Sequence, residues 1–369
     1  MTAVDSSEDF KQNVAIVIDP GSGSIKAGFS GDEKPHKVLR SVVGLSKKDQ
    51  TECYFGNNIL CKDSDDLILK RPITSGMISD WDSLEKLWSH VLYEELQVCP
   101  EEHGILMTDP AFSPISNREK TAELLFEGFG AQAMYVGYQP VLSMYSYGLV
   151  TGLVVDSGAG CTSVSPVCNG YCLPHATFHM DLAGKGVSDY LSKLLADVGH
   201  GSALQQKSSV QEMKKQSCYV SQLSSEDKGT PLDYQLPDGT TITLGDERFR
   251  GPEILFCPSD AGMSQPGVHI LAMNSLQKCA PEWQAALMAN VALCGGSSMF
   301  SGFPERLQAE MEKLAPRDSI IGMLSGAHRE FASWVGGSII TCLSSFQPMW
   351  VKGQEYQEEG SSVVRNKCY

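Results

Sequence analysis

The sequence predicts an α/β fold built from two related halves. Two stretches, VIDPGSGSIKAG and VVDSGAGCTSVS, share one pattern: an apolar run ends in an acid, small residues and glycines follow, and an alternating segment comes last. Helical periodicity follows each unit, and apolar strands alternate with the helices. The 369 residues are too many for one ordinary core and are about right for two domains.

Each unit indicates a strand, a glycine turn and a returning strand. Residues 14–18 are a continuous apolar run rich in β-branched side chains, as in a strand covered on both faces. Residues 19–23 break the run, and residues 24–30 alternate between apolar and polar, as in a strand with one buried face. The second unit has the same three parts at 153–155, 156–160 and 162–167.

Helices are predicted at a distance from each unit. Asp82 and Glu85 resemble a capping pair that opens a helix whose apolar face continues to residue 92. Residues 116–119, Ser-Asn-Arg-Glu, read as a second capping box, and Gly130 is expected to end that helix. Further strands are expected at 105–108 and 291–293.

Composition and charge exclude several classes of protein. The net charge of −15 argues against binding to nucleic-acid backbones, because these require clustered Lys and Arg. No apolar run approaches the roughly 20 residues of a membrane helix, and the polar N-terminal residues lack the apolar core of a signal peptide. The twelve cysteines are scattered without a CxxC pair, so reduced thiols in the cytosol or nucleus are expected instead of a zinc site.

Two glycine turns that face each other suit a polyphosphate. Glycines in a tight turn let backbone amides point into one concavity that binds anions. Asp19 and Asp156, each at the end of a strand, are placed to hold a divalent cation through water. Either turn alone reads more readily as an ordinary hairpin, but their duplication favours a clamp for a Mg²⁺–polyphosphate. The first turn lacks the third glycine of GxGxxG and no GxxxxGK[ST] is present, so these two phosphate-binding motifs are excluded.

A third glycine-rich stretch, LCGGSSMFSGFPERL, follows the strand expected at 291–293. Ser297 and Ser298 are candidates to cap the helix beyond it. An ordinary strand-to-helix turn and a nucleotide-binding loop are equally good interpretations of this stretch.

The motifs taken together resemble the actin family. They stand in the family order and cover nearly the whole chain: DPGSGSIKAGFSGD, DWDSLEKLW, NREK, AMYVGYQPVLSMYSYG, DSGAG, LPHA, DLAG, YQLPDG, ITLGDERFR, CGGSSMFSGFPERL, SWVGGSI and RNKCY. The resemblance implies the actin fold of the actin, Hsp70 and sugar-kinase ATPase superfamily, with a cleft for ATP or ADP and Mg²⁺ or Ca²⁺. The stretches NREKTAELLFEGFG, SYGLVTGLVVDSG and LCGGSSMFSGFPERL lean toward the divergent actin-like proteins of vertebrate male germ cells (testis, spermatogenesis).

The same resemblance implies two large domains. The first is expected at 1–146 plus 332–369, with a small subdomain at about 41–71, and the second at 147–331, with a small subdomain at about 183–263.

Site residues are carried over on the matching motifs. Asp19 and Asp156 match acids that orient the waters of the metal, and Gln139 matches a glutamine that helps to place the attacking water. The implied nucleotide-binding residues are Gly21, Ser22, Gly23, Lys26, Ser157, Gly158, Gly160, Gly184, Lys214, Gly295, Gly296, Ser297, Met299 and Phe300. A groove for amphipathic helices of cytoskeletal or actin-binding-type proteins is implied at Tyr145, Gly148, Tyr171, Leu343 and Met349, and ordinary packing at a domain junction is an equal alternative.

Several residues differ from the family pattern at positions that take part in the family's reaction. Ala159 stands where the family has a second acid, and Ser163 where it has a histidine that orders the lytic water. Such losses typically slow a reaction about 10–100-fold for a supporting residue and about 10²–10⁴-fold for proton transfer. At most a weak ATPase is therefore expected. Around the base, Lys215 replaces an acid and Glu330 replaces a lysine, so the two either pair across the pocket or reflect drift in a pocket no longer used.

Other differences from the family pattern lie in regions that the family uses to assemble filaments. The loop at 45–53, LSKKDQTEC, is several residues shorter than the loop that grips the next subunit in a filament, and the region between Cys218 and LPDG is also short. Long homopolymers are therefore not expected. The favoured hypothesis is a cytoplasmic, cytoskeletal, or nuclear or perinuclear, protein that acts as a structural or scaffold component. The alternative is an ATP-binding, slowly hydrolysing protein that polymerises; a sugar or acetate kinase is disfavoured because no substrate-base insertion is recognisable.

Overall fold

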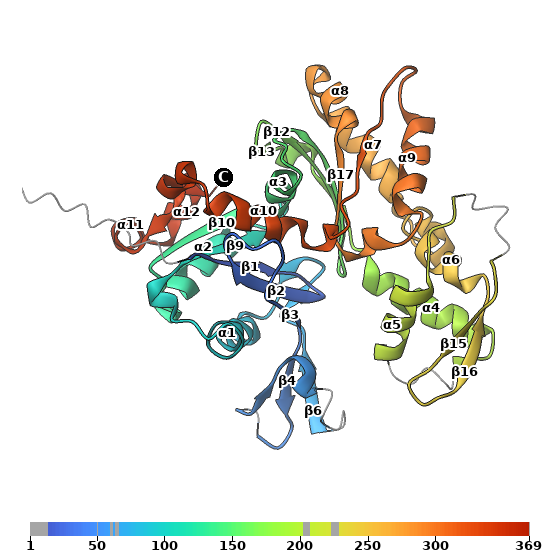
Figure 1. Cartoon of the computed structure of the whole chain (residues 1–369), viewed down its shortest axis with the longest axis horizontal. Coiled ribbons are helices and arrows are strands. Elements are labelled where there is room, and N and C mark those ends of the chain that lie inside the picture. The colour runs from blue at the N-terminus through green and yellow to red at the C-terminus, as the bar shows by residue number, and fades with distance from the viewer. Residues whose placement is uncertain are drawn as a thin grey trace, which may run out of the picture.

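The computed structural model describes residues 14–49, 51–59, 62, 66–201, 207–222 and 229–368. The polar N-terminal stretch, Gln50 of the short loop, residues 223–228 of the second shortened region and Tyr369 lie outside them. Two mixed sheets with helices packed around them lie next to each other, and the C-terminal helices return to the first sheet (Figure 1). The predicted α/β class is confirmed.

The first sheet has the strand order β19–β10–β9–β1–β2–β3. Strands β1 and β2 form an antiparallel hairpin, and β9 lies parallel to β1 on its other side. The strands are β1 (Ile16–Pro20), β2 (Ser24–Phe29), β3 (Lys37–Arg40), β9 (Gly104–Asp109), β10 (Ala133–Tyr138) and β19 (Val351–Lys352).

The second sheet repeats this arrangement in the order β13–β12–β11–β17–β18, with β14 also paired to β12. Again a hairpin, β11 with β12, is followed by a parallel neighbour, β17. The strands are β11 (Gly152–Ser157), β12 (Thr162–Cys168), β13 (Tyr171–Cys172), β14 (Phe178–Met180), β17 (Val291–Cys294) and β18 (Met323–Leu324).

Both hairpins extend further toward their turns than the apolar pattern predicts. Asp19 pairs with Lys26 in the first hairpin, and Asp156 pairs with Ser163 in the second. The acids therefore belong to the strands and not to the turns. At the other end, Val14 precedes β1 and is half exposed, so the expected start of this strand was two residues too early.

The remaining strands form three small sheets, and two of these sheets lie at the lower side of the molecule in Figure 1. One extends from the first half and one from the second. They comprise β4 (Val43–Ser46), β5 (Cys53–Tyr54) and β6 (Leu67–Lys70); β15 (Leu232–Gln235) and β16 (Thr241–Leu244); and the short pair β7 (Ile73–Thr74) and β8 (Met77–Ile78).

Twelve α-helices are found among the described residues. Those of the first half are α1 (Trp81–Ser89), α2 (Ile115–Glu123), α3 (Gln139–Ser146), α10 (Ala332–Thr341), α11 (Gly353–Glu359) and α12 (Val364–Lys367). Those of the second half are α4 (Gly184–Asp197), α5 (Lys207–Ser217), α6 (Glu247–Glu253), α7 (Val268–Lys278), α8 (Pro281–Ala289) and α9 (Phe303–Leu314). Within the described ranges, none of the helices has the length and apolar character needed to cross a bilayer.

The predicted helix caps were wrong. Helix α1 is capped by Asp80, whose carboxylate accepts a hydrogen bond from Ser83 N at 3.0 Å, so the pair beginning at Asp82 lies inside the helix. Helix α2 follows Pro114 without a side-chain cap. The expected ending is present, because Gly130 has φ 62° and lies just beyond the last turn of the helical segment.

Each sheet has its own buried cluster. The first joins strands and helices of the N-terminal segment to C-terminal residues such as Trp334 and Val364, which are fully buried. The second is built from residues between Leu153 and Ile321. Helices α3 and α10 pack closely where the halves meet, since a Cβ on Gly336 would collide with the carbonyl oxygen of Leu142.

Candidate functional site

The glycine turns of the two hairpins face each other. A Cβ added to Gly23 would lie 2.6 Å from the Cβ of Ala159, and one added to Gly160 would lie 2.6 Å from Ser22 Oγ. Glycine is needed at both positions because any side chain would push the turns apart. The structure thus brings together, in one place, two loops that are far apart in the sequence.

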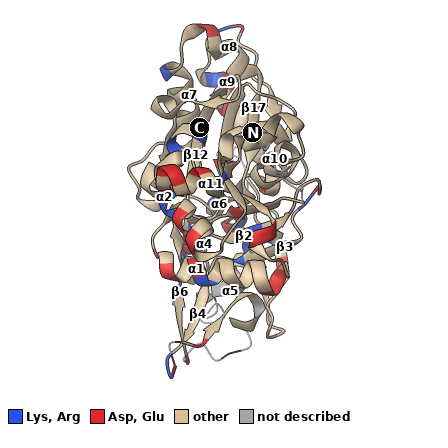
Figure 2. Ribbon diagram, turned by 90° about the vertical axis from the view of Figure 1, so that its left-hand side faces the viewer, with Lys and Arg blue, Asp and Glu red and all other residues tan. Residues whose placement is uncertain are grey.

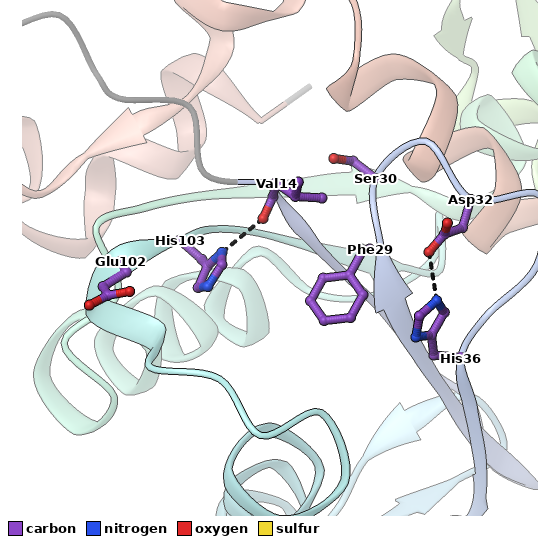
Figure 3. A pocket seen from close by; sticks show the side chains of 7 residues that line it. All are labelled: Val14, Phe29, Ser30, Asp32, His36, Glu102 and His103. Carbon is purple, nitrogen blue, oxygen red and sulfur yellow. Dashed lines mark hydrogen bonds and ion pairs between the residues drawn. The ribbon is translucent and has the colours of Figure 1, made fainter.

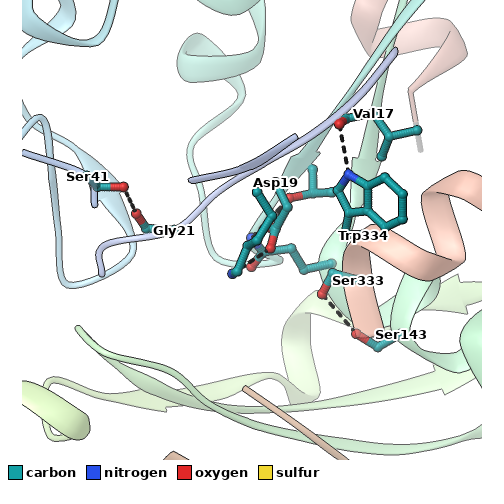
Figure 4. Close-up of polar contacts among 10 residues, drawn as sticks. Val17, Asp19, Gly21, Ser41, Ser143, Ser333 and Trp334 are labelled. Carbon is teal, nitrogen blue, oxygen red and sulfur yellow. Dashed lines mark hydrogen bonds and ion pairs between the residues drawn. The ribbon is translucent and has the colours of Figure 1, made fainter. Parts of the chain in front are cut away.

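Each turn is closed by a short backbone bond. Gly21 N donates to Ser24 O at 3.1 Å, and Gly158 N donates to Cys161 O at 3.0 Å. Ser41 supports the first turn by donating its hydroxyl to Gly21 O at 2.5 Å (Figure 4). Tight glycine turns of this kind present backbone N–H groups to an anion.

Asp19 is the centre of a polar network next to the first turn. Asp19 as a whole is 4% exposed, and its carboxylate accepts bonds from Lys26 Nζ at 2.8 Å, from the Thr108 hydroxyl at 2.5 Å and from Gln139 Nε2 at 3.1 Å. Gln139 also donates to Thr108 Oγ1 at 3.2 Å. These donors come from β2, β9 and α3, so three elements fix the carboxylate. Thr108 was missed from the sequence, where nothing distinguishes it from an ordinary strand residue.

The strand that carries Asp19 is also fixed from its other side. Trp334 on α10 donates its indole N–H to Val17 O at 2.8 Å, and the hydroxyls of Ser143 and Ser333 lie 3.0 Å apart (Figure 4). A buried indole N–H requires such a partner. Helices α3 and α10 therefore hold Asp19 in a defined position.

Asp156 occupies the equivalent strand end of the second hairpin. Burial raises the pKa of its carboxyl to about 6; Lys26 works against this rise, and the negative charge of Asp19 adds to it. Burial on its own would lower the pKa of Lys26, but Asp19, Asp156 and Glu330 together hold that pKa above its ordinary value. Two carboxylates and one ammonium are thus close enough to influence each other's charge.

Binding of a divalent cation is expected to weaken below pH 6. A folded-state pKa of about 6 for Asp156 means that the carboxyl takes up a proton as the pH falls through this value, and a protonated acid is a poor partner for the waters of a cation. The Mg²⁺ dependence of nucleotide affinity, measured between pH 5 and 8, should fall by up to about tenfold per pH unit below 6. In Asp156→Asn this part of the pH dependence should disappear.

The raised pKa of Asp156 also makes the stability of the fold depend on pH, in the opposite direction to cation binding. The folded chain binds the proton of Asp156 more tightly than the unfolded chain, so this group stabilises the fold below pH 4 and loses that contribution as the pH rises through about 6. An unmodified chain whose nucleotide affinity with Mg²⁺ does not change between pH 5 and 7, while its fold is intact at both values, would contradict the assignment of Asp156.

A second set of residues packs against Gly158. Gly184 N and Ser297 Oγ both donate to Gly158 O, at 3.1 and 2.6 Å. Lys214 Nζ donates to Gly184 O at 2.6 Å, and burial lowers the pKa of this lysine to about 8. The predicted nucleotide residues of α4, α5 and the third glycine stretch are therefore neighbours in space.

The third glycine stretch does not have the helix cap that its serines predicted. Ser298 Oγ donates to Gly295 O at 2.7 Å, and α9 begins only after Gly302. Gly295 has φ 81° and lies against Asp156, so a side chain would be excluded there. Gly296 differs, because no atom lies within 4 Å of the position that its Cβ would take. Met299 ends the 3₁₀ helix η9 (Gly296–Met299), and buried Phe300 follows it.

One of the substituted positions, Ala159, lies at the facing turns, and the other, Ser163, lies in the strand β12 that follows the second turn. Ala159 is exposed next to Gly23. Ser163 lies between Asp156 and His179 in one transverse row across β11, β12 and β14. His179 in turn stacks on Phe112 of the first half, with ring centroids 4.4 Å apart. His179 was missed, because only the strand register shows which residue lies opposite Ser163.

The predicted alternative of a Lys215–Glu330 pair was wrong. Lys215 Nζ lies 4.0 Å from Glu212 on its own helix and is largely exposed. A carboxylate oxygen of Glu330 lies 3.9 Å from His328. Because each charge has a local neighbour, the two do not compensate each other across the site.

The residues of the predicted partner groove come from three segments. Burial raises the pKa of Tyr145, and the charge of an ionised Tyr171 would add to this rise. Tyr171 is 57% exposed. Gly148 has φ 70° and open space around its Cβ position. Leu343 is 48% exposed, and Met349, at the far end of η11 (Ser344–Met349), packs partly on the first core.

A shallow hollow on the first half does not suit a phosphate. It is lined by Val14, Phe29, Ser30, Asp32, His36, Glu102 and His103 (Figure 3). His36 lies 2.9 Å from the Asp32 carboxylate, and His103 Nδ1 lies 2.8 Å from Val14 O. No Lys or Arg is among the lining residues, and the described part of the chain has no group of three side chains suited to bind a metal directly.

Charges of both signs are interspersed over the helices on the side seen in Figure 2. Asp and Glu are the more frequent, in keeping with 44 acidic and 29 basic residues in the chain. Such a surface suits partners with basic groups.

Comparison with known proteins identifies the relatives of this chain. The family model described as Actin matches residues 10–369. Actin-like protein 9 of Bos taurus and of Homo sapiens are each 40% identical to the chain, and Actin-like protein 7B of Rattus norvegicus is 39% identical. Each of these matches covers 96% of this chain and 88% of the relative. The residues matched by the family model include both hairpins, both glycine turns and the C-terminal helices. The chain therefore belongs to the actin family.

Proposed function

We propose that this actin-like protein holds a nucleoside di- or triphosphate with Mg²⁺ or Ca²⁺ between its two glycine turns, and that it acts mainly as a structural or scaffold component of the cytoskeleton through partner binding. The observation that carries the proposal is the direct approach of the turns, Gly23 to Ala159 and Ser22 to Gly160. In the family the nucleotide is ATP or ADP.

The polar residues at the turns fit such a ligand. Lys26 is held by Asp19 beside the first turn, where its charge offsets both the carboxylate and an incoming phosphate. Asp19 and Asp156 are the acids that would hold the waters of the cation. The bound cation would supply charge neutralisation of the phosphates, and Gln139, already hydrogen-bonded to Asp19, would orient a water near them.

Turnover by this site is proposed to be slow. Ala159 has no polar group to orient a water, and the hydroxyl of Ser163 is a poor proton acceptor at neutral pH. His179, in the same row as Ser163, stacks on Phe112 and is not in the position of the missing histidine. The chain is therefore at most a weak ATPase.

A scaffold role is favoured over a polymerising one by the loop between β4 and β5. Lys47, Lys48 and Asp49 are exposed there, and the Asp49 carboxylate accepts a bond from Thr51 N at 2.9 Å, which closes the turn on itself. A short, charged and self-bonded turn has little apolar surface to bury in another subunit.

We further propose the domain division 1–146 plus 332–369 and 147–331, with small subdomains at about 41–71 and 183–263. It is supported by the two separate cores and by the return of the C-terminal helices to the first sheet. Location in the cytoplasm and cytoskeleton, or in or around the nucleus, and expression in male germ cells are proposed from the family motifs.

The nucleotide proposal is tested by what leaves the protein on denaturation. Purified chain should release close to one nucleotide per molecule, identified and quantified by chromatography. Gly296→Leu places a side chain in open space and should empty the site without disturbing the fold, whereas Gly353→Leu, at the start of α11, should not. An unfolding midpoint confirms that both variants fold. Absence of nucleotide from the purified chain, together with no binding of added nucleotide, would refute the proposal.

Introducing a charged side chain into the predicted partner groove is expected to abolish partner binding. Leu343→Glu puts a charge on an exposed apolar position that would otherwise contact the apolar face of an amphipathic helix, whereas Met349 is left unchanged because it packs partly on the first core. Pull-down with a helical peptide from an actin-binding protein should be lost, while thermal unfolding is unchanged. Leu314→Glu, at a similarly exposed position on α9, is the matched control. Equal recovery of the peptide by all variants would argue against the groove.

A further inference from the structure

The two halves of the molecule touch through a pair of stacked rings near the glycine turns. The ring of Phe112 and the imidazole of His179 lie nearly parallel, with centroids 4.4 Å apart and an interplanar angle of 17°. Phe112 follows the end of β9 in the first half by three residues, and His179 is the middle residue of β14 in the second half. The stack therefore joins two elements that belong to different sheets.

Close contacts connect this stack to both glycine turns. A Cβ on Gly76, in the turn between β7 and β8, would lie 3.0 Å from the ring of Phe112 and 2.9 Å from the sulfur of Cys161. Gly76 N donates to Ser22 Oγ of the first turn at 2.8 Å, and Cys161 directly follows the second turn. A continuous packed path thus leads from the first turn through Gly76 and Phe112 to His179.

The stack lies far from the connection between the halves. In the domain division proposed above, the chain crosses at 146–147 and 331–332, where α3 and α10 pack on each other. Strand β11 begins beside α3, because a Cβ on Gly152 would lie 2.6 Å from Met144 Cε. The row that contains Asp156 and His179 comes four residues later, about 13 Å along the strand. A rotation about the connection would separate the turns and the two rings together.

A nucleotide held between the turns is bounded by both halves, so its release requires the turns to move apart. We propose that the stack of Phe112 on His179 is a latch, a contact that keeps the halves together over the ligand and slows its release. Such a pair stabilises the closed arrangement beyond the area that it buries. The inference rests on the proposed nucleotide site and concerns how fast that site exchanges its ligand.

The test measures dissociation of a fluorescent ADP analogue from the full chain with Mg²⁺, after addition of excess unlabelled ADP. Phe112→Leu keeps an apolar side chain against Gly76 but removes the ring, and His179→Gln removes the imidazole. Each should speed dissociation about two- to tenfold, the effect of losing one aromatic pair. The double variant should be no faster than the single variants, because both changes break the same contact. His179→Phe, which keeps a ring, should release the analogue at the wild-type rate.

The matched control is the stack of Phe55 on His90, whose centroids lie 4.5 Å apart at an interplanar angle of 12° and which lies entirely within the first half. Phe55→Leu and His90→Gln should leave the dissociation rate unchanged. Unchanged dissociation in Phe112→Leu and His179→Gln, additive effects in their double variant, fast release from His179→Phe, or equal acceleration by the control variants would each overturn the latch. The nucleotide site would remain standing in all four cases.

A chain that binds no nucleotide would refute the proposed site, and the latch is then measured by hydrogen exchange. The amide of Gly76, which donates to Ser22 Oγ, should exchange faster in His179→Gln than in the wild-type chain or in His90→Gln. Equal exchange in all three chains would overturn the latch without reference to any ligand.

Discussion

Phosphate release should rise about 10²–10⁴-fold when Ala159 is replaced by Asp and Ser163 by His in the same chain. The wild-type protein is expected to release phosphate at a rate close to that of a solution without protein. Asp19, Gln139 and Asp156 are already in place, so the double change supplies only the missing acid and the missing imidazole.

The structure gives both new side chains a suitable location. Ala159 is exposed on the second turn, so a carboxylate there has space and lies opposite the first turn. Ser163 lies next to Asp156 across the hairpin, so an imidazole at this position starts from the strand that faces the site. Because the two residues act on the same water, their effects are expected to be more than additive.

The rate is measured as single-turnover phosphate release with Mg²⁺ and saturating nucleotide. Ala159→Asn with Ser163→Ala is the matched control, since it changes the same positions without adding an acid or a base. Nucleotide occupancy is measured alongside, so that a change in binding is not mistaken for a change in turnover. A fast rate in the wild-type chain, or no gain in the Asp/His variant at full occupancy, would show that these positions do not limit turnover.

The sequence predicts the repeated hairpin well because both of its signals are local. Apolar runs and glycines mark the strands and turns wherever they occur. The predicted strand ends were wrong because the true ends depend on residues that are distant in the sequence. Asp19 continues β1 because Lys26, Thr108 and Gln139 bind its carboxylate, and two of these residues come from distant elements. An apolar pattern ends at a charged residue, whereas the strand ends where its pairing ends.

The helix caps could not be predicted from residue type alone either. Asp80 and Asp82 are equally good caps by residue type, and only the direction in which the chain enters α1 decides that Asp80 accepts the bond from Ser83. In the site, Ser297 binds Gly158 and His179 lies opposite Ser163. Such pairs depend on sheet register and packing, which the motifs do not contain.

The chain is not expected to form long filaments by itself. In a filament each subunit makes the same heterologous contact with the next, and the contact repeats without closure. The turn at 45–53, with Gln50 outside the described residues, offers Lys47, Lys48 and Asp49 on its exposed side. Loss of an extended apolar loop would remove roughly half of a standard contact of about 1,600 Å², which leaves an interface in the range of weak encounters.

The measurement is pelleting and electron microscopy of the pure protein with Mg²⁺-nucleotide over a range of concentrations. Monomers, or short species seen only with a partner, are expected. Ile68 and Leu69 on the edge strand β6, in the same small sheet as the loop, are 40% and 56% exposed and are the apolar surface to test as a replacement for the loop. If long filaments form at micromolar protein, the expectation is wrong, and Leu69→Lys then decides between two explanations. Loss of those filaments would assign the contact to β6, whereas their persistence would show that the charged turn itself supports assembly.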